Sequence, residues 1–357
     1  MQRPVKMKDV ARKAGVSVMT VSRAFRKDAS VRPETRDAIL KVAEDLGYVF
    51  DSRAANLRSQ KTGFVAVTIP SINNANFADT VAGLSEVLSN EGLQVLLAYT
   101  NYDMVQEERA IEQLLRRRPE AIVVTGGKHT PRARRLLEGA GIPVVEAWDL
   151  PAEPIGHVVG FSNAATMVAM VDHLVAQGHT RIAFIGGDVA ADTRGADRRR
   201  GFMAAMAEHG LSCDRLIEAG PPPISMREGA NAMARLLAVY PDTAAVVCVS
   251  DLSAFGALTE CQRRGLRVPQ DMVVTGFGAY EIARICVPTL TTVDPFPRKI
   301  GEDIASLILI AIADPQPPQT RRIAPELVVA GSSVGRADGP PNLLVDSTGI
   351  KFLGDGD

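Results

Sequence analysis

Apolar stretches of strand length alternate with amphipathic helical stretches from residue 63 to about residue 288. The predicted strands span residues 65–69, 94–98, 121–124, 144–146, 158–160, 182–185, 245–249 and 273–275. The predicted helices between them span residues 77–90, 104–117, 132–140, 163–177, 198–209, 225–238 and 252–263. Such alternation is typical of parallel sheets that helices cover on both faces. The sequence therefore predicts an α/β fold for most of the chain.

This alternation is too long for one sheet, because it runs through about 230 residues. Two similar halves with a cleft between them are expected instead. The first half should comprise residues 62–162 and 290–325, and the second residues 163–289 and 326–336, with the chain crossing between them. Because ligands of parallel sheets bind beyond the carboxyl ends of the strands, the cleft is expected to bind a small molecule. Residues 337–357, with few aromatic side chains, are predicted to form a disordered tail.

The beginning of the chain shows a different pattern, in which three short helices are predicted. The first covers residues 8–14 and ends at Gly15, because glycine tolerates the left-handed conformation that follows a helix. The second covers residues 18–25 after Ser17, a favourable N-cap residue, and the third begins at Pro33. Two helices joined by a tight turn are typical of a helix-turn-helix reader, whose second helix enters the major groove of DNA. A small helical bundle without this function is the alternative.

The distribution of charge favours the DNA-binding interpretation. The whole chain has 40 Lys and Arg and 41 Asp and Glu, which gives a formal net charge of -1. Residues 1–61 carry 14 basic and 7 acidic residues, a net charge of +7, whereas the remainder carries 26 and 34, a net charge of -8. Such asymmetry indicates contact with nucleic acid or a membrane. Residues 1–61 are therefore predicted to form a headpiece that attracts DNA phosphates.

Several short segments of the sequence, taken together, form a pattern that is specific to one protein family. They are residues 7–17, 19–23, 32–36, 46–48 and 53–58 in the headpiece, and residues 265–271 before 273–277 in the core. These segments resemble the lactose/galactose-repressor family, and the similarity extends to about Arg336. The resemblance implies a DNA-binding repressor with a hinge helix at about residues 51–59 and a periplasmic-binding-protein-like core of two doubly wound, parallel-sheet subdomains. It also implies a small-molecule effector and a homodimer on a near-palindromic operator.

The resemblance assigns DNA contacts position by position. The implied contacts are Ser17, Val18, Met19, Thr20, Ser22, Arg23, Arg32, Asn56 and Leu57. Arg23 suits guanine through a bidentate hydrogen bond, while Val18 and Met19 can contact a thymine methyl group. The hydroxyl side chains would bind phosphates, which fixes register without reading sequence. Leu57 corresponds to the leucine that wedges into the minor groove in this family.

Two positions of the headpiece depart from the family pattern. Lys6 stands where the family usually has a threonine cap for the first helix, and Arg32 where it often has a serine. Both caps are therefore expected to be weaker, although Arg32 would gain a phosphate contact.

The resemblance also implies effector contacts in the cleft. These are Asn74, Asn76, Phe77, Trp148, Arg198, Ser250 and Asp251. Arg198 precedes Gly201 by three residues, as the effector-binding arginine of the family does, and a guanidinium suits a carboxylate or vicinal hydroxyls. Trp148, the only tryptophan, is either a platform for a sugar or a packing residue between the halves. Asp251 is either a ligand contact or a helix cap.

One departure from the family bears on the identity of the effector. The family often has an acidic residue shortly after the equivalent of Phe277, where it binds sugar hydroxyls, but this chain has Gly278 and Ala279. The loss of that carboxylate suits an anionic ligand, which it would repel. Residues 146–150 and 154–163 resemble the gluconate-operon-repressor branch of the family. We therefore expect a gluconate-like sugar acid, with a purine or a neutral sugar as the alternative.

Other classes of function find less support in the sequence. The glycine clusters at residues 186–188 and 275–278 match neither a dinucleotide-binding nor a phosphate-binding loop, which argues against a nucleotide-dependent enzyme. The five histidines form no metal-spaced pair, and the four scattered cysteines suggest buried thiols in a reducing cytosol. No cofactor or metal is expected. The first residues lack the apolar run of a secretory signal, which argues against a transport receptor and for a cytoplasmic location.

Overall fold

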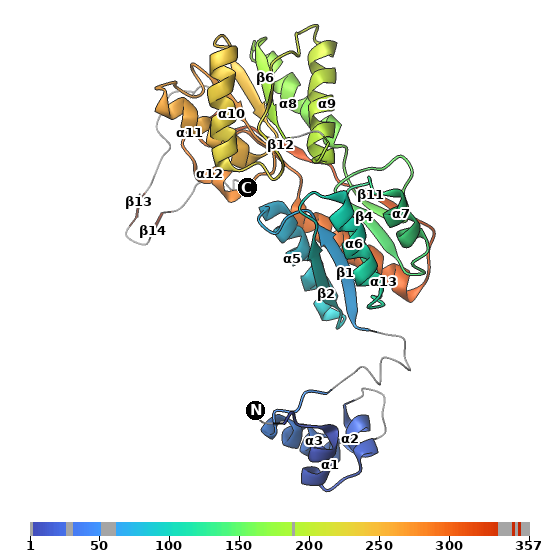
Figure 1. The fold of residues 1–357 in the computed structure, drawn as a ribbon. Coiled ribbons are helices and arrows are strands. Elements are labelled where there is room, and N and C mark those ends of the chain that lie inside the picture. Colours follow the sequence, from blue (N-terminus) through green and yellow to red (C-terminus); the bar gives the residue numbers. More distant parts are fainter. Residues whose placement is uncertain are drawn as a thin grey trace. The chain divides into compact units, whose positions relative to one another are not determined.

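A computed structural model describes residues 3–25, 31–50, 62–187, 190–334, 345–346 and 349–350. The chain divides into two compact units, Met1–Thr62 and Gly63–Asp357. This division lies one residue from the boundary that the sequence predicts. Figure 1 shows a helical first unit and a larger unit in which helices surround two sheets. None of the helices in the described part of the chain is long and apolar enough to cross a membrane.

The first unit contains the three predicted helices, α1 (Met7–Ala14), α2 (Val18–Ala24) and α3 (Pro33–Asp45). Gly15 follows α1 with a φ of 67°, the left-handed conformation that its position requires. The apolar face of each helix is buried in a shared core. Its fully or nearly fully buried members are Val10, Ala11, Val21, Ala24, Ile39 and Ala43. Phe25 closes this core with a stacked contact to Phe50 and an edge contact to Tyr48.

The first half of the large unit is a parallel sheet of six strands in the order β11-β5-β4-β3-β1-β2. The strands are β1 (Phe64–Ile69), β2 (Gln94–Tyr99), β3 (Ile122–Thr125), β4 (Val144–Ala147), β5 (His157–Gly160) and β11 (Thr320–Arg322). The helices that cover it are α5 (Ala75–Asn90), α6 (Met104–Leu115), α7 (Pro131–Glu138) and α13 (Pro297–Ala313). Parallel order places the carboxyl ends of all six strands at one edge of the sheet.

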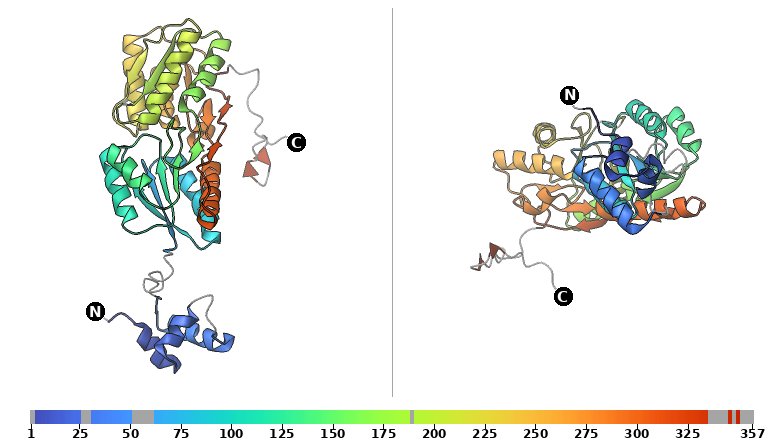
Figure 2. Two further views of the ribbon diagram at one scale, coloured as in Figure 1. Left: turned by 90° about the vertical axis from the view of Figure 1, so that its right-hand side faces the viewer. Right: turned by 90° about the horizontal axis from the view of Figure 1, so that it is seen from below.

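The second half has a parallel sheet of four strands in the order β7-β6-β8-β9. Its strands are β6 (Ile182–Gly186), β7 (Leu216–Glu218), β8 (Ala245–Cys248) and β9 (Val273–Thr275). Its helices are α8 (Asn163–Ala176), α9 (Thr193–Glu208), α10 (Met226–Val239), α11 (Asp251–Arg263) and α12 (Glu281–Ile285). An antiparallel pair, β10 (Thr292–Asp294) and β12 (Glu326–Val328), lies where the chain crosses between the halves (Figure 2). The short strands β13 (Val345–Asp346) and β14 (Gly349–Ile350) pair with each other.

The structure contains elements that the sequence pattern did not predict. Helix α13, which packs against α5, is not among the predicted helices. Strand β11 is polar because it forms the edge of its sheet, and β7 has only three residues, so neither shows a strand pattern. Helix α9 begins at Thr193, five residues before the predicted start, because Asp192 caps a polar first turn through the backbone N–H of Gly195.

A buried ionic cluster attaches α6 to the first sheet. The Nδ1 atom of His129 lies 3.0 Å from Oε2 of Glu107 on α6, and its Nε2 atom lies 3.7 Å from Oε1 of Glu146 on β4. Burial alone would lower the pKa of His129, but the hydrogen bond to Glu107 and the negative charges of Glu107 and Glu146 outweigh it and raise the pKa to about 9. The imidazole therefore carries a proton in the folded chain at neutral pH.

The stability of the core should fall as the pH rises from 6.5 to 8.5. Folded His129 keeps its proton over this range, whereas the unfolded side chain, with a pKa near 6.5, loses it. The folded state therefore binds more protons, and the free energy of unfolding should decrease by about 2 kcal/mol. Urea titrations followed by the fluorescence of Trp148 would measure this slope. His129→Gln should flatten the slope, and a slope that persists in this variant would contradict the assignment.

Candidate nucleic-acid interface and ligand cavity

Ser17 organises the beginning of helix α2. Its side-chain oxygen accepts a hydrogen bond from the backbone N–H of Thr20 at 3.1 Å and lies 2.9 Å from the Thr20 hydroxyl oxygen. An N-cap bond of this kind satisfies one of the free N–H groups at a helix start. The cap fixes where α2 begins, and therefore which side chains its first turn displays.

The exposed face of α2 carries the side chains that the sequence assigns to base contacts. Val21 and Ala24 are completely buried in the headpiece core, whereas Val18 and Met19 are 47% and 60% exposed. Arg23 is exposed beside them, and Ser22 and Thr20 are half-buried. An arginine beside two apolar side chains on a free helix face matches the hydrogen-bond acceptors of guanine and the methyl group of thymine in the major groove.

The structure shows the weak N-caps that the sequence predicts for α1 and α3. Neither Lys6 nor Arg32 provides a side-chain hydrogen bond to the helix that it precedes, and Arg32 is exposed. In α1 the carboxylate of Asp9 compensates, because it accepts the backbone N–H of Lys6 at 3.0 Å. Asn56, Leu57 and the predicted hinge helix at residues 51–59 lie outside the described residues.

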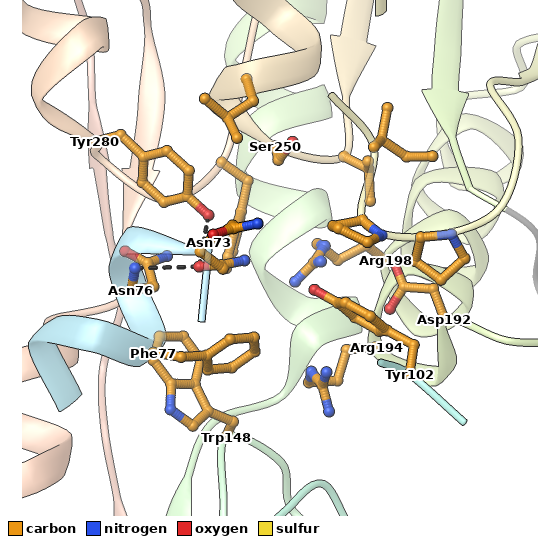
Figure 3. A pocket seen from close by; sticks show the side chains of 17 residues that line it. Asn73, Asn76, Phe77, Tyr102, Trp148, Asp192, Arg194, Arg198, Ser250 and Tyr280 are labelled. Atoms are coloured by element: carbon orange, nitrogen blue, oxygen red, sulfur yellow. Dashed lines mark hydrogen bonds between the residues drawn. The ribbon is translucent and has the colours of Figure 1, made fainter. Parts of the chain in front are cut away.

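A cavity lies between the two halves of the core, at the carboxyl ends of their strands (Figure 3). Its lining residues are Asn73, Asn74, Asn76, Phe77, Tyr102, Trp148, Asp192, Arg194, Arg198, Pro222, Pro223, Ile224, Val249, Ser250, Leu252, Phe277 and Tyr280. Six of the seven predicted effector contacts belong to this set, and Asp251 does not. The cavity combines aromatic rings, amides and arginines, which suits a small polar ligand.

The amides at the cavity come from the turn between β1 and α5. Asn74 caps α5, because its Oδ1 atom accepts the backbone N–H of Asn76 at 3.1 Å. Asn76 is 4% exposed, and its own Oδ1 atom is buried without a hydrogen-bond partner. A buried amide oxygen that lacks a partner is costly, so a hydroxyl group from a ligand would stabilise it.

Trp148 joins a group of aromatic rings that spans the two halves. Its ring centroid lies 5.4 Å from that of Phe77 and 5.9 Å from that of Phe161, which in turn lies 6.2 Å from Phe277. The backbone of Trp148 has a φ of 71°, a conformation that large side chains adopt rarely and that often marks binding sites. The Trp148 ring therefore both lines the cavity and packs between the halves, and its contact with a sugar stays a prediction.

Arg198 is half-buried in the cavity wall, and no carboxylate of the described residues contacts it directly. Its Nη1 atom donates to Oδ1 of Asn163 at 2.7 Å, and its guanidinium carbon lies 4.3 Å from the centre of the Phe277 ring. Its Nε atom has no hydrogen-bond partner. Burial lowers the pKa of Arg198, but a guanidinium keeps its proton even so. The site therefore holds a positive charge that no described side chain neutralises by direct contact.

Arg194 is a second arginine in the cavity, which the sequence analysis missed. It lies one turn before Arg198 on α9 and is only 6% exposed. Its guanidinium carbon is 5.5 Å from the ring centre of Phe77 and 6.0 Å from that of Tyr102. Within the described ranges it makes no hydrogen bond or ion pair. The four-residue spacing to Arg198 was a signal for it, because side chains at i and i+4 share a helix face.

Ser250 and Asp251 occupy different environments, although they are adjacent in the sequence. Ser250 lines the cavity and caps α11 through the backbone N–H of Ser253. Asp251 is completely buried behind it and accepts hydrogen bonds from the hydroxyl of Thr292 at 2.6 Å and the backbone N–H of Tyr280 at 2.8 Å. Burial raises the pKa of Asp251 to about 6. Its placement at the cavity is corrected accordingly, because both carboxylate oxygens bind groups of the protein itself.

Tyr280 also reaches the cavity, which the sequence did not indicate. Its hydroxyl donates to Oδ1 of Asn74 at 2.9 Å, so it joins the second half of the core to the first (Figure 3). Burial raises the pKa of Tyr280, and the hydroxyl therefore keeps its proton. In the part of the chain that the structure describes, no group of three or more His, Cys, Asp or Glu side chains is arranged to hold a metal ion.

Comparison with known proteins relates both units to one family. Residues 6–51 match the model of bacterial regulatory proteins of the lacI family, and residues 171–334 match a periplasmic binding protein-like domain. The chain is 36% identical over 307 residues to the HTH-type transcriptional regulator GntR of Pseudomonas aeruginosa, covering 86% of this chain and 89% of that protein.

Solved structures give the same result. The crystal structure of a LacI family transcriptional regulator from Silicibacter pomeroyi has a TM-score of 0.73 and 43% identity, covering 77% of this chain and all of that one. The lac repressor dimer bound to operator shares the fold, with a TM-score of 0.79 at 22% identity over 93% of this chain and all of that one. The chain thus belongs to the lacI family of bacterial regulatory proteins and is a DNA-binding transcriptional regulator, not an enzyme.

Proposed function

We propose that this regulator represses an operon for the use of a sugar acid and that a gluconate-like acid binds in the core cavity as its effector. The observation that carries the proposal is the pair of arginines at the cavity, the buried Arg194 and the half-buried Arg198, neither of which forms an ion pair in the described chain. A buried positive charge without a partner is unfavourable. A carboxylate ligand would neutralise it through charge-assisted hydrogen bonds.

The charges of the cavity favour a ligand with one acidic group. Asp192 is the one acidic residue among the described residues that line the cavity, and its Oδ1 atom is bound to the backbone N–H of Gly195 at 3.0 Å. Two arginines and one aspartate leave a net charge of +1. The faces of Phe77 and Trp148 suit the C–H groups of a sugar chain, and the free amide oxygen of Asn76 suits a hydroxyl.

We further propose that the regulator acts in the cytoplasm as a homodimer on a near-palindromic operator. The edge strand β2 supports an interface between copies, because it displays Leu97 and Tyr99 at 40% and 55% exposure beside a groove with α6. Effector binding would change the relation between the two halves of each core and so the placement of the headpieces. Ser17, Val18, Met19, Thr20, Ser22, Arg23, Arg32, Asn56 and Leu57 are the proposed DNA contacts.

The single tryptophan provides a direct test. Because Trp148 lines the cavity, its fluorescence should change when a ligand binds there. We expect gluconate to alter the emission with saturable binding, and glucose and hypoxanthine to bind at least about tenfold more weakly. Gel shifts with DNA upstream of the regulator's own gene neighbourhood should show a complex that gluconate alters. Binding of glucose or hypoxanthine, but not of gluconate, would contradict the proposal.

A further inference from the structure

The amide of Asn74 has its oxygen side fully engaged within the protein. Its Oδ1 atom accepts hydrogen bonds from the backbone N–H of Asn76 at 3.1 Å and from the hydroxyl of Tyr280 at 2.9 Å. A carbonyl oxygen has two lone pairs, so both acceptor positions are filled. The NH₂ group of Asn74 is consequently the part of the amide that faces the other groups of the cavity, among them the side chain of Tyr102, and that can donate to a ligand.

The position of Tyr280 depends on the glycine that replaces an acidic residue of the family. A Cβ atom on Gly278 would come 2.5 Å from Cε1 of Tyr280 and 3.0 Å from Nδ2 of Asn76, which is closer than packed atoms approach. Gly278 also has a φ of 128°, which side-chain-bearing residues rarely adopt. Any larger residue at this position would displace the tyrosine ring. The absence of a side chain at Gly278 therefore makes room for the ring of Tyr280.

Further contacts hold the tyrosine in place. Its backbone N–H donates to the buried carboxylate of Asp251 at 2.8 Å, and that carboxylate also accepts the hydroxyl of Thr292 at 2.6 Å. Tyr280 itself is 7% exposed. The hydroxyl thus approaches Asn74 from a rigid support in the second half, while Asn74 belongs to the first half.

We propose that Tyr280 determines specificity by fixing the orientation of the Asn74 amide, so that this wall of the cavity donates hydrogen bonds and selects an acid over a neutral sugar. The inference rests on the proposed function and adds a selecting residue to it. Figure 3 shows Arg194 and Arg198 across the cavity from Tyr280. Because Asn74 belongs to the first half and the two arginines to the second, donors from both halves line the cavity. A carboxylate only accepts hydrogen bonds, whereas each hydroxyl of a neutral sugar also carries a donor, which finds no acceptor on these groups.

The test compares the affinities for gluconate and for glucose, measured with Trp148 fluorescence and calorimetry on the full chain. Tyr280→Phe removes only the hydroxyl, which frees the amide to turn. We expect the ratio of the two affinities to fall by about tenfold, since gluconate loses a hydrogen bond and glucose does not. Tyr240→Phe is the matched control, because the Tyr240 hydroxyl also donates a hydrogen bond, in its case to the backbone oxygen of Asp214, but Tyr240 lies outside the cavity lining.

A second variant tests the direction of the amide without relying on Tyr280. Asn74→Asp keeps an oxygen for both internal donors but exchanges the NH₂ group for negative charge. We expect it to weaken gluconate binding by about 100-fold or more. In this background, adding Tyr280→Phe should no longer change the ratio of affinities, because there is no amide left to orient.

The measurements distinguish a wrong proposed function from a wrong role for Tyr280. If the wild-type chain shows no preference for gluconate over glucose, the proposed function is wrong and the inference falls with it. If the wild type prefers gluconate and Tyr280→Phe retains the full preference, only the role of Tyr280 is overturned. An equal loss of both affinities in Tyr280→Phe would also overturn it, because that result indicates a structural role.

Discussion

Replacing Arg198 with methionine should reduce the affinity for an acidic effector by more than about 100-fold and leave a repressor that no longer responds to it. The Arg198 side chain is half-buried, its guanidinium lies over the ring of Phe277, and its buried Nε atom has no hydrogen-bond partner among the described residues. Its loss removes charge-assisted hydrogen bonds and half of the positive charge at the site, each of which contributes a few kcal/mol in a buried environment. Methionine fills a similar volume, so the core should remain folded.

The measurement has two parts, Trp148 fluorescence titrations with gluconate and gel shifts with and without it. Arg215→Met is the matched control, because Arg215 also stacks on an aromatic ring, that of Tyr240, but bonds Asp242 outside the cavity. Arg198→Lys should fall between the wild type and methionine, since it keeps the charge and loses the planar donor pair. Gluconate affinity within about threefold of the wild type in Arg198→Met would remove Arg198 from the site.

Local patterns allowed prediction of the headpiece and of most strands. Ser17 as a cap, Gly15 as a stop and the apolar positions of α2 each depend on neighbours within a few residues. The same holds for the buried strands of the core, whose apolar runs are continuous. Helix α13 escaped prediction because its long apolar stretch gives a weak periodic signal until α5 and the first sheet are known.

The cavity was predictable only in part, because its residues meet through tertiary structure. Arg198 could be placed from its spacing to Gly201. Tyr280 and Tyr102 could not, since their positions follow from how the halves pack. For Asp251, the sequence suggested a cavity residue that the structure places behind the cavity wall. Its place at a strand end suggested a ligand contact, but the Thr292 hydroxyl and the Tyr280 N–H occupy its carboxylate.

Arg23→Ala should weaken binding of the operator by about 100-fold or more, while leaving effector binding unchanged. A bidentate contact between arginine and guanine contributes about 1–3 kcal/mol, and a dimer on a near-palindrome makes it twice. The side chain is exposed on α2 and outside the headpiece core, so its removal should not unfold the domain. Fluorescence anisotropy with labelled operator would measure the affinity, and the Trp148 titration would confirm that the cavity still binds its ligand.

The dependence on salt separates a base contact from a phosphate contact. Arg23→Lys keeps the charge but not the planar pair of donors, so a base-reading arginine predicts lost operator affinity with an unchanged salt slope. Arg12→Ala serves as the comparison, because Arg12 is also exposed in the headpiece but lies on α1 and pairs with Asp9. It should affect operator and unrelated DNA alike. If Arg23→Lys binds operator as well as the wild type does, the arginine contacts phosphate, and Val18 and Met19 carry the sequence reading of α2.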